Sequence, residues 1–152
     1  MADSIKVFAP ATVANLTCGF DILGLAINGP GDELVAKKTS GSGVTIVSIE
    51  GDEGRLSKDA SKNTAGISAN QFLQEIDYSG GIEISLYTKM PFGSGMGSSA
   101  ASAVAGVFAV NELLGRPLNQ RELLRFAVEG ERIACGSGHA DNVAPSLLGG
   151  IT

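Results

Sequence analysis

The sequence predicts an α+β fold in which strands and helices are mixed without strict alternation. Residues 82–87 alternate between apolar and polar side chains, as expected for a strand with one buried face. Two long helical patterns follow this strand with no strand between them, and two earlier strand candidates flank a turn. Strict alternation of strands and helices would instead favour a doubly wound parallel sheet.

The first part of the chain contains three strand candidates. Residues 5–8 predict an opening strand, and residues 10–19, which are rich in small and polar side chains, predict a loop. Residues 33–37 and 44–49 predict two further strands. The glycine and serine residues at 39–43 are typical of a turn, so we expect these two strands to form a hairpin.

Helices are expected before and after the strand at 82–87 in the sequence. Residues 64–76 place apolar side chains at a spacing that partly fits one helical face. The residues from 97 to 114 predict a helix that ends before the Gly-Arg-Pro sequence at 115–117. A second helix is expected at 119–134, because its first residue is an asparagine, a good N-cap. After Gly136 we expect irregular structure.

Composition and charge exclude several classes of protein. Hydrophobic residues make up 43% of the 152 residues, which excludes a disordered chain. The net charge is -5, with no long run of either sign, so we expect no nucleic-acid or membrane partner. Cys18 and Cys135 have no metal-binding spacing, and the first ten residues predict neither a signal peptide nor a membrane span. These features indicate reduced thiols and a cytoplasmic location.

Glycine is unusually frequent, with 21 residues, about twice the ordinary share. Its densest cluster lies at 91–102, between the clearest strand and the alanine-rich helix. A glycine-rich loop that opens onto a helix N-terminus presents backbone N–H groups and the positive end of the helix dipole. An acidic protein could bind phosphate in this way, with Ser98 and Ser99 as caps, hydrogen-bond donors or magnesium ligands. The alternative is an ordinary glycine-rich turn before a serine-capped helix.

Two common phosphate loops do not account for this cluster. A P-loop requires a Gly-Lys pair, and the chain contains none. Residues 95–100 match the looser form of the dinucleotide fingerprint, with alanine in the last position. That fingerprint belongs between two parallel strands, whereas here a helix is followed by another helix.

The complete string Pro91-x-Gly93-x-Gly95-x-Gly97-Ser98-Ser99-Ala100 resembles the phosphate-binding motif of a superfamily of small-molecule kinases. This superfamily includes galactokinase, homoserine kinase, mevalonate kinase and phosphomevalonate kinase. Three further stretches resemble the homoserine kinases in particular: residues 9–15 with Gly19-Phe-Asp21, Asn63-Thr64, and residues 139–145 with Gly149-Gly150. The matches keep the family's order and extend over almost the whole chain.

The resemblance implies that residues 1–152 form the N-terminal ATP-binding domain of such a kinase. Its fold would resemble ribosomal protein S5 domain 2, a mixed sheet with helices packed on one side. A second, ferredoxin-like domain would follow this chain, so we expect the isolated chain to have weak activity or none. The implied reaction transfers the γ-phosphate of ATP to the side-chain hydroxyl of L-homoserine, with Mg²⁺, in cytoplasmic threonine biosynthesis. The resemblance leaves a homodimer open.

The resemblance also implies roles for individual residues. The implied nucleotide-binding residues are Asn63, Pro91, Gly93, Ser94, Gly95, Met96, Gly97, Ser98 and Ser99. The implied substrate-binding residues are Asn15, Asp21, His139, Asp141 and Asn142. Ser98 and Glu131 would hold magnesium. The implied catalytic residues are Ser98, Glu131, His139 and Asp141, and a general base, if one acts, would be His139 or Asp141.

Physical chemistry agrees with part of this assignment. The ammonium group of homoserine requires carboxylate and amide oxygens, which the implied substrate residues supply, whereas no lysine or arginine lies in a substrate-matching stretch to bind its carboxylate. Taken singly, Glu131 could be a solvated carboxylate paired with an arginine, His139 a structural residue, and Asn15 and Asp21 loop caps. Two functional alternatives also stay open: a kinase of this superfamily for another alcohol, and a non-catalytic nucleotide-binding fragment.

Overall fold

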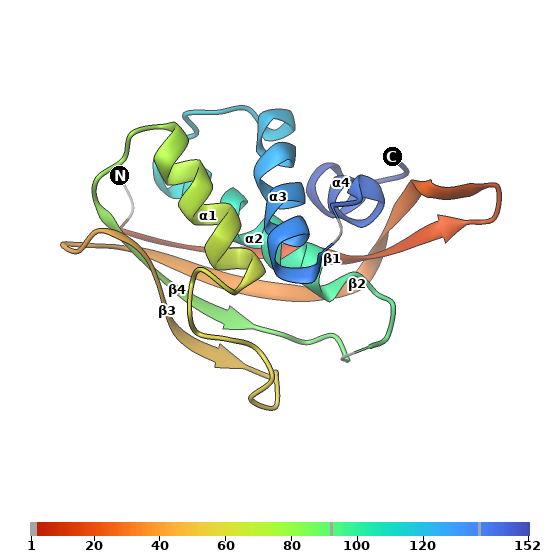
Figure 1. The fold of residues 1–152 in the computed structure, drawn as a ribbon, viewed down its shortest axis with the longest axis horizontal. Coiled ribbons are helices and arrows are strands. Elements are labelled where there is room, and N and C mark those ends of the chain that lie inside the picture. The colour runs from red at the N-terminus through yellow and green to blue at the C-terminus, as the bar shows by residue number, and fades with distance from the viewer. Residues whose placement is uncertain (1–2, 92, 137) are drawn as a thin grey trace.

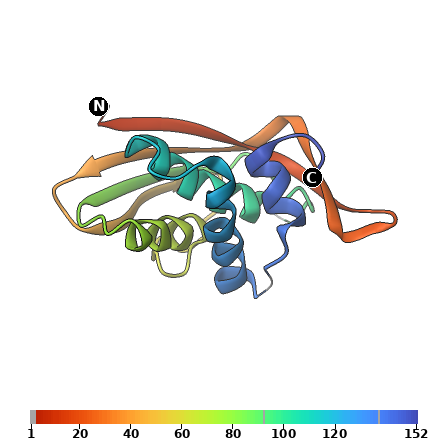
Figure 2. The same cartoon turned by 90° about the horizontal axis from the view of Figure 1, so that it is seen from above.

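A computed structural model describes residues 3–91, 93–136 and 138–152. The strands are β1 (Ser4–Leu16), β2 (Gly19–Thr39), β3 (Gly43–Glu50) and β4 (Gly81–Tyr87). The helices are α1 (Thr64–Glu75), α2 (Ser98–Leu113), α3 (Leu124–Cys135) and α4 (Ala140–Leu148), and a 3-10 turn (Gln120–Leu123) leads directly into α3. The helices cover one face of the sheet (Figures 1 and 2). The predicted α+β class, with a mixed sheet and helices on one side, is therefore confirmed.

The strand order in the sheet is β1-β2-β4-β3. The β2 strand pairs antiparallel with β1 and with β4, and β3 pairs parallel with β4. The expected hairpin between residues 33–37 and 44–49 is therefore wrong, because β4 lies between these strands. The side chains of Ile82, Ile84 and Leu86 in β4 are buried, whereas Val47 in β3 is exposed. The strand with the more apolar face occupies the interior position, and β3 lies at the edge.

The expected loop at residues 10–19 is also wrong, because β1 continues to Leu16 and β2 begins at Gly19. Pro10 is compatible with this strand because β1 lies at the edge of the sheet, where a missing N–H group removes no bond to an outer neighbour. The pairing of β1 with β2 shifts register just after Pro10. The far end of this hairpin projects beyond the helices (Figure 1).

The helices agree with the sequence except at the end of the chain. α1 and α2 lie where the sequence predicts them, and Asn119 forms a capping box with Glu122. The region after Gly136, expected to be irregular, contains α4. Pro145 lies inside α4 and is buried, and the hydroxyl of Ser146 donates to the carbonyl of Pro10. This contact fastens α4 to β1.

α2 is the central helix and contacts both the sheet and the other three helices. Its small side chains let the neighbours approach closely. A Cβ atom at Gly106 would lie 2.4 Å from the carbonyl oxygen of Ala65 in α1. Cys18 is a free, exposed thiol, whereas the side chain of Cys135 lies outside the part of the chain that the structure describes. No helix in the described part is both long and apolar enough to cross a membrane.

Candidate functional site

The glycine-rich loop lies between β4 and α2 and opens onto the first turn of α2. Gly93, Gly95 and Gly97 have φ values of 69°, 70° and 68°, in the left-handed region that favours glycine. Gly97 is the N-cap of α2, and it provides no side-chain hydrogen bond to the N–H groups of the first turn. These N–H groups can therefore bind an anion, as the sequence predicts.

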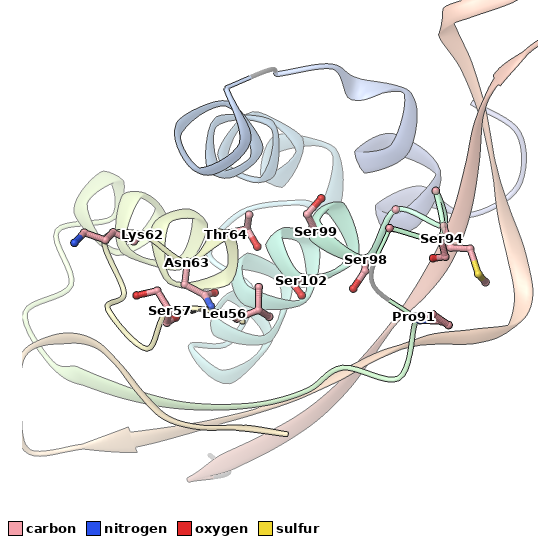
Figure 3. Close-up of a pocket in the computed structure, with 14 residues that line it drawn as sticks. Leu56, Ser57, Lys62, Asn63, Thr64, Pro91, Ser94, Ser98, Ser99 and Ser102 are labelled. Carbon is pink, nitrogen blue, oxygen red and sulfur yellow. Dashed lines mark hydrogen bonds between the residues drawn. The ribbon is translucent and has the colours of Figure 1, made fainter. Parts of the chain in front are cut away.

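This loop forms one wall of a cavity of about 360 Å³ (Figure 3). Every residue that the sequence assigns to nucleotide binding, from Asn63 on one side to Ser99 on the other, lines this cavity. The sequence assigned no role to five further lining residues: Leu56, Ser57, Lys62, Thr64 and Ser102. Thr64 and Ser102 belong to stretches that the sequence singled out and Lys62 precedes Asn63, but Leu56 and Ser57 lie in a polar segment without a recognisable motif.

Asn63 fixes the wall opposite the glycine loop. Its side-chain oxygen accepts a hydrogen bond from the backbone N–H of Ala65, at 3.0 Å, and so caps α1. Its amide nitrogen donates to the carbonyl of Ser57, also at 3.0 Å. Asn63 is buried, so this side chain acts on the cavity by holding the Ser57 segment against the start of α1.

A second cavity, of about 180 Å³, is lined by all five residues that the sequence assigns to substrate binding and by Glu131. These six residues are Asn15, Asp21, Glu131, His139, Asp141 and Asn142. They come from the β1–β2 hairpin, from α3 and from the start of α4. The fold thus brings together residues that are more than a hundred positions apart in the sequence.

Local backbone geometry holds the hairpin residues of this second cavity. Asn15 and Asp21 have φ values of 59° and 57°, a conformation that asparagine and aspartate tolerate better than most residues. The side chain of Asn15 accepts a hydrogen bond from the backbone N–H of Asp21, at 3.0 Å. Both side chains are therefore placed by the turn at the end of the hairpin.

Two other contacts place the residues of α4. The hydroxyl of the buried Thr12 donates to the side-chain oxygen of Asn142, at 2.8 Å. A Cβ atom at Gly24 would lie only 1.7 Å from the carbonyl oxygen of Asp141. Glycine at this position of β2 is therefore required for α4 to approach the sheet as closely as it does.

The second cavity is acidic. Asp21, Glu131 and Asp141 line it, whereas no lysine or arginine of the described chain does. Burial raises the pKa of Glu131, and the nearby charge of Asp141 raises it further, while a hydrogen bond from Ser99 opposes the shift. The Oε1 atom of Glu131 is buried and has no hydrogen-bond partner among the described residues. The cavity is thus suited to a cationic group.

The two serines at the start of α2 have different partners. The hydroxyl of Ser99 donates to Oε2 of Glu131, at 3.2 Å. The hydroxyl of Ser98 donates instead to Oδ2 of Asp32, at 2.7 Å, and the two side chains diverge in Figure 3. The structure therefore joins Glu131 to Ser99, whereas the sequence paired Glu131 with Ser98 as metal ligands.

Asp32 is a residue of this region that sequence reasoning missed. It is fully buried in β2, where burial raises its pKa and hydrogen bonds from Lys89, Ser98 and Met90 oppose the shift. The strand predicted from the sequence begins at residue 33, so Asp32 had the appearance of an exposed residue just before a strand, and nothing in the sequence marked it.

The residues near Glu131 fit a magnesium ion. Magnesium prefers oxygen ligands and commonly takes only one or two from the protein when phosphates supply others. The unpartnered Oε1 of Glu131 and the hydroxyl of Ser99 are oxygen ligands of this kind. Among the described residues, no group of three or more histidine, cysteine, aspartate or glutamate side chains is arranged to hold a metal ion.

The sequence is similar to curated proteins named homoserine kinase. The protein from Chlorobium phaeovibrioides is 53% identical over 96% of this chain and 49% of its own length. The protein from Methanococcus maripaludis strain C5 is 41% identical over 97% of this chain and 49% of its own length. The chain therefore spans about half the length of these relatives.

Solved structures and a family profile agree with these similarities. The crystal structure of homoserine kinase from Cytophaga hutchinsonii has a TM-score of 0.97 and 60% identity, over 99% of this chain and 48% of the other. A mevalonate kinase from Methanococcus jannaschii shares the fold, with a TM-score of 0.75 and 17% identity, over 97% of this chain and 52% of the other. The profile described as "GHMP kinases N terminal domain" matches residues 63–150, more than half of the chain. The chain belongs to the GHMP kinase family and contains its N-terminal domain.

Proposed function

We propose that this chain is the nucleotide-binding part of a kinase that transfers the γ-phosphate of ATP to the hydroxyl of L-homoserine. The observation that supports this most directly is the contact between the two cavities. Ser99 lines the cavity at the glycine loop, and its hydroxyl donates to Glu131, which lines the acidic cavity. A phosphate bound at the start of α2 would therefore lie next to a site suited to the ammonium group of an amino-acid substrate.

The glycine loop would bind the triphosphate through backbone N–H groups, with no basic side chain required. Glu131 and a serine hydroxyl of the loop would hold Mg²⁺, and Ser99 is the serine already in contact with Glu131. The bound ion would neutralise charge on the phosphate oxygens during transfer. The remaining walls, with Asn63 and its hydrogen-bonded partner Ser57, would enclose the rest of the nucleotide.

The acidic cavity would hold the amino-acid substrate by its ammonium group. Asp21, Asp141 and the amides of Asn15 and Asn142 supply the oxygens that such a group requires. Either His139 or Asp141 could accept the proton of the attacking hydroxyl, although phosphoryl transfer depends mainly on positioning and charge stabilisation. The similarity to proteins named homoserine kinase favours L-homoserine, and with it a cytoplasmic step of threonine biosynthesis.

ADP release tests this proposal in a protein that contains this chain and has the length of its relatives. The alcohols to compare are homoserine, serine, mevalonate and galactose, each with and without Mg²⁺. We expect Mg²⁺-dependent release with homoserine and little release from the 152 residues alone. Activity confined to another alcohol would overturn the assignment of homoserine as the substrate. ATP binding without phosphorylation of any of the four alcohols would indicate a non-catalytic nucleotide-binding module.

Asp21→Asn provides a second test, because it removes one negative charge that would face the substrate ammonium group. We expect a higher KM for homoserine, since a hydrogen bond to a charged group contributes about 1.5–3 kcal/mol. Asp77→Asn is the matched control: both aspartates are exposed and have left-handed backbones, with φ of 57° and 52°, but Asp77 follows α1 and lines neither cavity. Equal KM values in the two variants would contradict this role of Asp21.

A further inference from the structure

Asp32 contacts both ends of the glycine loop with one carboxylate. Its Oδ1 atom accepts hydrogen bonds from the backbone N–H groups of Lys89 and Met90, at 2.8 and 3.4 Å, just before the loop. Its Oδ2 atom accepts a hydrogen bond from the hydroxyl of Ser98, at 2.7 Å, just after the loop. The chain just before the loop and the chain just after it are therefore bonded to the same side chain.

The position of Asp32 in β2 explains this arrangement. The pairing of β2 with β4 ends at Glu33 and Tyr87, so the backbone of Asp32 has no partner in β4. The N–H of Thr88 still donates to the carbonyl of Glu50 in β3, and the next two N–H groups, of Lys89 and Met90, donate to the carboxylate of Asp32 in place of a backbone acceptor. The chain is thus held at the sheet until the loop begins.

The middle of the loop has a separate attachment. The backbone N–H of Thr12 in β1 donates to the carbonyl of Met96, at 3.0 Å. Gly93 and Gly95 lie on the other side, where a Cβ atom would meet nothing within 4 Å. The loop is therefore fixed on its protein side and open on its cavity side.

We infer that Asp32 is a positioning residue that holds the glycine loop in its nucleotide-binding form before the nucleotide arrives. This inference rests on the proposed nucleotide site. A buried carboxylate is costly unless hydrogen bonds compensate for it, and all three of its donors come from the two ends of the loop. A loop released at both ends would have to be ordered by the nucleotide itself, and that cost would reduce the affinity.

Two substitutions of Asp32 separate its hydrogen bonds from its charge. Asp32→Ala removes all three hydrogen bonds, and we expect ATP to bind at least about tenfold more weakly, since ordering even one or two residues has a cost of this size. Asp32→Asn keeps an oxygen for Lys89 and Met90 and an amide group that can donate to Ser98. We therefore expect Asp32→Asn to bind ATP within about threefold of the unchanged chain.

Asn111→Ala is the matched control for a purely structural effect. Asn111 is also buried, and its side chain joins the two sides of a turn at the other end of α2 through Leu118. We expect this variant to lower the melting temperature while leaving ATP affinity within about threefold of the unchanged chain. Calorimetric titration with ATP and Mg²⁺ of a protein that contains this chain and has the length of its relatives, together with ligand-free melting temperatures, gives both readouts.

Amide hydrogen exchange without ligand adds a readout that does not depend on nucleotide. Asp32→Ala should accelerate exchange in residues 93–98 and leave the β4 amides protected, whereas loss of global stability would accelerate both. If Asp32→Ala does not fold, Ser98→Ala removes one attachment alone and should show the same local acceleration.

The outcomes distinguish this inference from the proposed function. Failure of the unchanged chain to bind ATP would overturn the nucleotide site and the inference with it. If the unchanged chain binds ATP and Asp32→Ala binds it with the same affinity, the inference about Asp32 is overturned and the nucleotide site is not. Equal weakening in Asp32→Asn and Asp32→Ala would show that charge acts rather than attachment, and equal weakening in Asn111→Ala would show a general loss of stability.

Discussion

Replacing Gly95 by alanine tests whether the backbone of the glycine loop meets the nucleotide. Gly95 has a φ of +70°, and a Cβ atom there would meet no atom within 4 Å. The ligand-free protein would therefore bear only backbone strain, about 1–2 kcal/mol for a left-handed residue. In a chain of this size that corresponds to a melting temperature lower by about 2–8 °C.

The effect on ATP binding should be larger than the effect on stability. The added methyl group would occupy the open side of the loop, where the proposed triphosphate approaches the N–H groups. A hydrogen bond to a charged group contributes about 1.5–3 kcal/mol, so the loss of one such bond raises the Kd about 10- to 150-fold. Calorimetric titration with ATP and Mg²⁺ measures this change.

Gly115→Ala is the matched control for Gly95→Ala. Gly115 has a φ of +88°, and a Cβ atom there also meets nothing within 4 Å, but this residue lies in the turn after α2, away from the loop. We expect a similar loss of melting temperature and unchanged ATP affinity. Equal ATP affinity in the two variants would refute the claim that the loop backbone contacts the nucleotide.

Three further predictions concern the two cavities and their surroundings. Glu131→Gln should raise the Mg²⁺ concentration needed for activity without lowering ligand-free stability at neutral pH. Burial raises the pKa of Glu131, so ionisation of this group weakens the fold as pH rises above about 4.5, and glutamine avoids this loss. Gly24→Ala should displace Asp141 and raise the KM for the amino acid, because the new methyl group cannot lie 1.7 Å from a carbonyl oxygen; unchanged kinetics would contradict the proposed site. A hydrogen bond from the N–H of Leu56 lowers the pKa of Asp52, so the stability that this group contributes is present above about pH 4 and is lost as pH falls. Asp52→Asn should therefore reduce the fall in melting temperature at acid pH.

Local signals in the sequence predicted several elements well. The alternation of Ile82, Ile84 and Leu86 predicted β4 because one buried face imposes a period of two. The asparagine at 119 predicted the start of a helix because its side chain satisfies free N–H groups there, and the structure shows this capping box. In such cases neighbours within a few residues decide the structure.

Elements that depend on distant partners could not be predicted in the same way. The turn at 39–43 suggested a hairpin, but the partner of β2 was decided by the apolar face of β4, far along the chain. The small and polar side chains of residues 10–19 suggested a loop, because their pairing with β2 at the edge of the sheet could not be known from their neighbours. The last part of the chain was expected to be irregular for a similar reason, since the contact of Ser146 with Pro10 exists only in the folded protein.

The residues of the site also differ in whether nearby sequence or distant partners determine their roles. The glycine loop could be recognised because its residues are consecutive, and the residues of the acidic cavity because they resemble family motifs. The role of Asp32 could not be recognised, because its three hydrogen bonds reach residues 57 to 66 positions away. A buried aspartate and an exposed one have the same sequence signature when their partners are that distant.

The strand order also has a consequence for how the chain folds. Thr39 at the end of β2 pairs with Gly81, so the inner edge of β2 stays unpaired until the whole segment containing β3 and α1 has been synthesised. Pairing across such a sequence separation is slow, because the loop must close before any contact compensates for its lost entropy. During that interval β1 and β2 expose an edge on which other chains can assemble. Productive folding on the ribosome therefore depends on the arrival of β4.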